Sequence, residues 1–91
     1  MSKKKYSSEE KFRYHNDRYY SCGKYGLKFG GTKHCYSVGF RDAFKGRNDV
    51  GAVKSEFGRK SARAYTLGFK RGEKSAWEYL KRTGKQPFSL N

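Results

Sequence analysis

The sequence contains no isoleucine and only four leucines and three valines, so aliphatic side chains for a hydrophobic core are scarce. No segment reaches the length of an apolar transmembrane helix, and no apolar stretch follows the N-terminal lysines as it would in a signal peptide. Two cysteines among 91 residues do not make a disulfide scaffold. We therefore expect one small, soluble, cytoplasmic domain with a thin core.

Acidic residues are also few, because 8 Asp and Glu stand against 22 Lys and Arg, giving a formal net charge of +14. An anionic partner relieves the self-repulsion of so small a cationic body, and the commonest such partner is nucleic acid. A membrane surface is less favoured, because no long amphipathic stretch carries Leu and Trp on one face. The charge predicts RNA or a nucleoprotein complex as partner, with neither a membrane nor a small-molecule substrate.

Aromatic residues and glycine replace the missing aliphatics, with eight tyrosines, seven phenylalanines, one tryptophan and eleven glycines. Tyrosine followed three positions later by glycine occurs three times, starting at Tyr20, Tyr36 and Tyr65. The last two copies continue with phenylalanine and a basic residue, which predicts two versions of one helical unit.

Glycine inside a helix costs about 1 kcal/mol relative to alanine, so its recurrence beside aromatics needs a reason. Gly39 with Ala43, and Gly68 with Gly72, each form a small-x-x-x-small stripe that allows two helices to cross at short distance. We interpret the repeat primarily as a packing device.

These patterns predict an all-α fold of two to three helices in a single domain. We expect a flexible basic arm over residues 1–6, a helical domain over 7–84 and a tail over 85–91. The two repeat units span about 33–47 and 59–83.

The first helix is predicted from a capping box of Ser7 and Glu10, and it runs from about Ser8 toward Cys22. A second helix is expected through Lys45, with its N-cap at Thr32 and its end at Gly46, leaving Lys33, Arg41 and Lys45 to water or a partner. We expect a loop over residues 47–58 in which Asp49 can cap one helical turn, because Val50, Val53 and Phe57 recur at helical spacing.

The third predicted helix runs from about Arg59 to Thr83 and ends at Gly84. Its apolar face is expected to comprise Tyr65, Gly68, Phe69, Gly72, Ala76 and Leu80, with Trp77 at the edge. A second face gathers cations, namely Arg63, Lys70, Lys74 and Lys81.

Residues 33–80 resemble the ribosome modulation factor family of bacteria. The resemblance rests on Tyr36, Gly39, Phe40, Arg41, Ala43, Gly46 and Arg47 in the first unit and on Tyr65, Leu67, Gly68, Phe69, Lys70 and Gly72 in the second. It implies two glycine-aromatic helices joined by a loop, in a protein that binds the ribosome near the messenger RNA exit and the anti-Shine-Dalgarno region and induces hibernation.

Nucleic-acid contacts are expected from cations that do not pack, because such cations supply most sequence-independent affinity. The candidates are Arg41, Lys45, Arg47, Arg59, Lys60, Arg63, Lys70, Arg71 and Lys74. Tyrosines outside the core stack on unpaired bases, and the candidates are Tyr14, Tyr19 and Tyr25. For each candidate the alternatives are a solvated cation and a core tyrosine.

Catalytic and metal chemistry find little support in the spacing. His15-Asn16-Asp17 is the only compact set for acid-base chemistry, and it stands in a surface-like segment. A zinc site from His15, Cys22, His34 and Cys35 has suitable ligand types but no tight pair of ligands. We expect neither an enzyme nor a cofactor.

Two functional classes remain. The first is an RNA-binding ribosome factor. The second is a phage-type inhibitory protein, for instance an anti-CRISPR or a host-polymerase inhibitor, which places its basic surface on an acidic or nucleic-acid-binding groove of a host complex.

Overall fold

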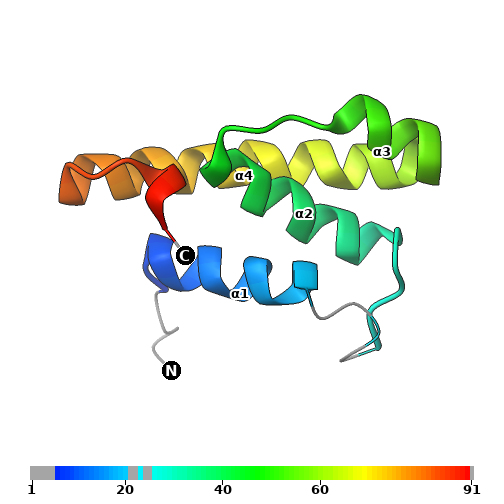
Figure 1. Ribbon diagram of the computed structural model, residues 1–91, viewed down its shortest axis with the longest axis horizontal. Coiled ribbons are helices and arrows are strands. Elements are labelled where there is room, and N and C mark those ends of the chain that lie inside the picture. The colour runs from blue at the N-terminus through cyan, green and yellow to red at the C-terminus, as the bar shows by residue number, and fades with distance from the viewer. Residues whose placement is uncertain (1–5, 21–22, 24–25, 91) are drawn as a thin grey trace, which may run out of the picture.

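The computed structural model describes residues 6–20, 23 and 26–90, and over these residues it is helical without strands. The α-helices are α1 (Ser8–Tyr20), α2 (Thr32–Lys45), α3 (Val50–Phe57) and α4 (Arg59–Thr83), and a short 3-10 helix, η2 (Pro87–Ser89), follows them (Figure 1). The all-α prediction is confirmed. Within the described residues no helix is both long and apolar enough to cross a membrane.

Helices α2 and α4 run in the same direction, and α1 packs alongside α2 in the opposite direction (Figure 1). The chain from the end of α2 therefore has to travel back before α4 begins, and residues 46–58, including α3, make that return. The C-terminal segment folds back so that η2 contacts both α2 and α4.

The crossing of α2 and α4 depends on three glycines. A Cβ added to Gly68 would overlap the carbonyl oxygen of Tyr36, and a Cβ added to Gly39 would overlap the carbonyl oxygen of Tyr65. At Gly72 the added atom would lie 2.5 Å from the carbonyl oxygen of Phe40. Each tyrosine-glycine unit thus sits on the backbone of the other, at a distance that only glycine permits.

Two apolar clusters form the core. Phe12 of α1, Phe40 and Phe44 of α2, and Ala76 and Tyr79 of α4 form the first. The second joins Cys35, Val53, Ala62 and Tyr65 from α2, α3 and α4. The three largest fully buried side chains, Tyr65, Phe12 and Phe44, are all aromatic, in keeping with the shortage of aliphatic residues.

The predicted helix ends agree with the structure at three places. The Ser7 hydroxyl accepts from the Glu10 backbone N–H at 3.2 Å, and the Glu10 carboxylate accepts from the Ser7 N–H at 3.4 Å. Gly46 and Gly84 end α2 and α4 in the left-handed conformation, with φ of 70° and 71°. The capping box and both glycine stops are confirmed.

Other local predictions are wrong. Residues 50–57 form the eight-residue helix α3, with Asp49 at its N-cap, where a loop with one turn capped by Asp49 was expected, so the described residues form four α-helices. Packing stabilises α3, because Val53 is buried in the second cluster and the Tyr65 hydroxyl accepts from the Asp49 N–H at 2.9 Å. Thr32 is the first helical residue of α2 and Gly31 occupies the cap position. The predicted extension of the first helix to Cys22 lies outside the described residues.

Candidate nucleic-acid interface

Helix α4 separates its cations from its core by helical spacing. Tyr65, Gly68, Gly72 and Ala76 are buried against the other helices. Residues on the opposite side are exposed, and they are Arg59, Arg63, Lys70, Lys74 and Lys81. At about 1.5 Å per residue, the row from Arg59 to Lys74 is about 22 Å long, or about six nucleotide steps of about 3.4 Å.

A hollow of about 490 Å³ lies between α3 and α4 at the start of this row. Four cations line it, Lys54 from α3 and Arg59, Arg63 and Lys70 from α4. The side chains of Ala62, Thr66 and Leu67 complete the wall, and among the described residues of this hollow none is acidic. An unopposed set of four positive charges around a concave surface attracts phosphate groups. Lys54 was not among the predicted contacts, because its proximity to α4 depends on α3.

Arg41 belongs to the interior of the fold and not to this surface. Its side chain is 11% exposed and pairs with Asp42 at 3.2 Å. The same guanidinium donates to Asn16 and Tyr20 of α1, and it lies 4.3 Å from the ring centre of Tyr19. The expectation that Arg41 stands free for a partner is therefore wrong, because it joins α1 to α2.

Lys45 and Arg47, two further candidates, have contacts within the chain. The ammonium of Lys45 donates to the carbonyl oxygens of Phe88 and Leu90, and burial lowers its pKa. Lys45 therefore fastens the C-terminal segment to α2. Arg47 is exposed and lies 3.7 Å from the carboxylate of Asp49, a solvated pair that is easily broken.

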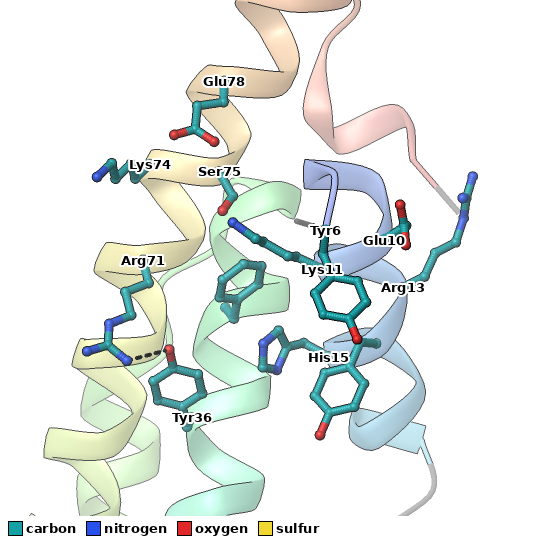
Figure 2. A pocket seen from close by; sticks show the side chains of 12 residues that line it. Tyr6, Glu10, Lys11, Arg13, His15, Tyr36, Arg71, Lys74, Ser75 and Glu78 are labelled. Carbon is teal, nitrogen blue, oxygen red and sulfur yellow. Dashed lines mark hydrogen bonds between the residues drawn. The ribbon is translucent and has the colours of Figure 1, made fainter. Parts of the chain in front are cut away.

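The remaining candidates lie on α4. Lys60 is exposed near the start of the helix. Arg71 and Lys74 line a second depression, a groove of about 960 Å³ between α1, α2 and α4, which we call the aromatic groove (Figure 2). Arg71 donates to the Tyr36 hydroxyl at 3.0 Å, so its guanidinium is held at the groove wall. Six of the nine predicted cations thus share one helix.

The predicted stacking tyrosines separate in the structure. Tyr14 is 58% exposed and lines the aromatic groove. Tyr19 is half-buried, with the Arg41 guanidinium over its ring, so it is not an open stacking surface. Tyr25 lies outside the described residues.

Sequence reasoning missed the other aromatic residues of the groove. Tyr36 and Phe40 form its α2 side, and His15 of α1 packs on Phe40 with ring centres 4.3 Å apart. The spacing of Tyr36 and Phe40 placed them on one face, but only the position of α1 leaves part of that face open as a groove wall. Lys11 and Arg13 of α1 also line the groove.

Of the residues considered for catalysis or zinc, Cys22 lies outside the described residues, and His15, His34 and Cys35 have internal partners. His15 Nδ1 lies 3.0 Å from the Ser37 hydroxyl, and burial lowers the pKa of His15 to about 4. His34 Nδ1 accepts from the Gly30 N–H at 3.2 Å, and the Cys35 thiol donates to the Gly30 carbonyl at 3.5 Å. Among the described residues, no three potential ligands converge on a metal-sized site.

No protein-family model, curated protein or solved structure matches this chain.

Proposed function

We propose that this protein is a non-enzymatic RNA-binding protein that contacts phosphates through the exposed cations of α4 and acts on the ribosome as a modulation or hibernation-type factor. The observation that carries the proposal is the hollow between α3 and α4, where Lys54, Arg59, Arg63 and Lys70 surround a surface without an acid among its described residues. Cations in this arrangement bind a phosphate backbone without reading its sequence.

The ribosome as target rests on the resemblance of residues 33–80 to the ribosome modulation factor family. Ribosomal RNA offers a dense array of phosphates to a small body of charge +14. Capture of ribosomal RNA and ribosomal proteins by the tagged protein, lost after nuclease treatment, supports this target. One stoichiometric protein retained after nuclease supports an inhibitor of a host complex instead.

Salt dependence tests the phosphate contacts directly. About six contacts lower the affinity for RNA on the order of a thousandfold between about 50 and 200 mM salt. Fluorescence anisotropy with a structured RNA measures this slope, and an affinity unchanged by salt contradicts the proposal.

Charge reversal locates the contact surface. The variant with Arg63, Lys70 and Lys74 replaced by glutamate removes six units of charge, from +14 to +8, while leaving the buried face of α4 intact. We expect it to melt near the wild-type temperature and to lose RNA binding.

A matched control carries glutamate at Lys28, Lys33 and Lys85, which are exposed and do not line either depression. It has the same net charge of +8, since three cationic residues again become glutamates. Stronger RNA binding by the control than by the α4 variant supports a localised interface. An equal loss of RNA affinity in both variants means that net charge alone governs binding. Unchanged RNA affinity of the α4 variant excludes α4 as the contact surface.

A further inference from the structure

The aromatic groove differs in chemistry from the cationic hollow on the same helix. Its walls come from three helices, with Tyr36 and Phe40 on α2, Tyr14 and His15 on α1, and Arg71 on α4 (Figure 2). Five residues with aromatic rings line the groove, namely Tyr6, Tyr14, His15, Tyr36 and Phe40, whereas none of the described residues that line the hollow is aromatic. Aromatic rings add nothing to the binding of a phosphate group, but the flat face of a base stacks on them.

The rings of the groove form a connected set. His15 packs on Phe40, and its ring centre lies 5.5 Å from that of Tyr36. Tyr14 meets His15 edge to face at 5.0 Å. The exposed Tyr14 ring has the Arg18 guanidinium 5.3 Å from its centre, farther than Arg41 lies from the half-buried Tyr19, and Tyr14 remains 58% exposed. The rings of Phe40, His15 and Tyr14 therefore pack in sequence on one another, and Tyr14, the most exposed of the three, keeps ring surface available for stacking.

The aromatic part of the lining is uncharged at neutral pH, because burial lowers the pKa of His15 to about 4 and its ring is bonded to the Ser37 hydroxyl. An uncharged base stacks on these neutral rings more readily than a phosphate does. A phosphate would lose its hydration against them and binds better in water or beside a cation. The aromatic rings of the groove thus suit the base of a nucleotide, and the charged residues that line it suit the phosphates.

The rim has more cations than acids. Lys11, Arg13, Arg71 and Lys74 line the groove together with two acids, Glu10 and Glu78. The Glu10 carboxylate is engaged at the start of α1 by the N–H and hydroxyl of Ser7. Figure 2 shows Lys11 extending from α1 toward α4, whereas Arg13 points away from the groove. The excess of positive over negative side chains along the groove complements the negative charge of a sugar-phosphate backbone.

The groove is also continuous with the cation row of α4, because Lys74 belongs to both and Arg71 lies next to Lys70 of that row. A strand that follows α4 from the hollow therefore reaches the groove without leaving the basic surface. The Tyr36 hydroxyl fixes Arg71 at this junction, at 3.0 Å.

We propose that the aromatic groove binds the base of an unpaired nucleotide in single-stranded RNA, stacked on Tyr14 and the rings beneath it, while Arg71 and Lys74 contact the flanking phosphates. This inference rests on the proposed RNA-binding function and adds a preference for unpaired over paired RNA. A duplex keeps its bases stacked on one another, so it engages the cations alone.

The test uses the full chain and a short single-stranded RNA with one central 2-aminopurine, free or annealed to its complement. We expect the wild-type protein to bind the single strand more tightly than the duplex and to change the 2-aminopurine fluorescence only in the single strand. Tyr14→Leu should weaken single-strand binding about 5- to 150-fold and abolish the fluorescence change, with duplex binding unchanged.

Tyr20→Leu is the matched control. Tyr20 is an exposed tyrosine of the same helix that accepts one arginine hydrogen bond at 3.3 Å, as Tyr14 does, but it does not line the groove. We expect it to behave as wild type toward the single strand.

A second variant, Tyr36→Leu, removes a ring of the groove and the anchor of Arg71. Its helicity is checked by circular dichroism before binding is measured. We expect single-strand binding to fall while duplex binding is retained.

The outcomes separate the two proposals. If the wild-type protein binds single strand and duplex equally, or if Tyr14→Leu and Tyr20→Leu bind the single strand equally, the groove does not hold a base and the phosphate-binding function stands. If the wild-type protein binds neither RNA, both proposals fail.

Discussion

Replacing Gly68 by alanine places one methyl group where α4 crosses α2. The added Cβ would overlap the carbonyl oxygen of Tyr36, and it would lie 2.9 Å from the carbonyl carbon of the same residue. Both atoms belong to the backbone of α2, so no change of side-chain rotamer relieves the overlap. The two helices have to move apart, and we expect Gly68→Ala to destabilise the fold.

The magnitude follows from two opposing effects. Alanine favours the helix by up to about 1 kcal/mol over glycine. Overpacking costs about 1 to 3 kcal/mol, and each 40 Å² or so of apolar surface that separation exposes costs about 1 kcal/mol. The clusters around Phe40 and Tyr65 lie beside the crossing and would be opened by it. We expect a net loss of about 1 to 2 kcal/mol, or roughly 5 to 15 °C in Tm.

Gly51→Ala is the matched control, because Gly51 also lies in a helix and a Cβ built there meets nothing within 4 Å apart from its chain neighbours and the adjacent helix backbone. We expect this variant to be as stable as the wild type or more stable by up to about 1 kcal/mol. Urea unfolding followed by circular dichroism measures both variants. A Gly68→Ala protein that unfolds at or above the wild-type urea concentration would refute the close crossing.

Two further predictions concern buried polar groups. Burial lowers the pKa of His15 from 6.5 to about 4, so its contribution to stability is complete above pH 6.5 and is lost as the pH falls toward 4, by up to about 3 kcal/mol. In His15→Gln the urea unfolding midpoint should therefore change less between pH 7 and pH 5 than in the wild type. The same change in both proteins would show that His15 does not control the pH dependence of stability. Tyr65→Phe removes the hydroxyl that donates to the buried Asp42 carboxylate at 2.7 Å and accepts from the Asp49 N–H, so it should lower the free energy of unfolding in urea by about 1 to 3 kcal/mol. Tyr36→Phe loses only an exposed hydrogen bond to Arg71 and should lower it by less than about 1 kcal/mol. Equal losses in the two variants would contradict this difference.

The two tyrosines also show where a sequence repeat stops being informative. Tyr36 and Tyr65 occupy the same position in their units, and both lie at the crossing of α2 and α4. Tyr65 is fully buried and bonded to Asp42, whereas Tyr36 is half-buried and faces the groove. Identical local patterns have different surroundings because α3 covers one of them and leaves the other open.

The sequence by itself determined the features that depend on neighbours along the chain. Ser7 with Glu10 starts α1, and glycines end α2 and α4, because caps are satisfied within a few residues. The cation row of α4 also follows from sequence, since helical spacing alone separates Arg63 and Lys70 from the buried face.

Tertiary structure decided the features that depend on distant contacts. The sequence indicated one turn of α3 capped by Asp49, but an isolated segment of eight residues is too short to be a stable helix, and its full length depends on packing against α4. Arg41 leaves the candidate surface because α1 supplies Asn16 and Tyr20 as its partners. The hollow and the aromatic groove each join residues from separate helices, so their composition is fixed only when packing sets which side chains converge.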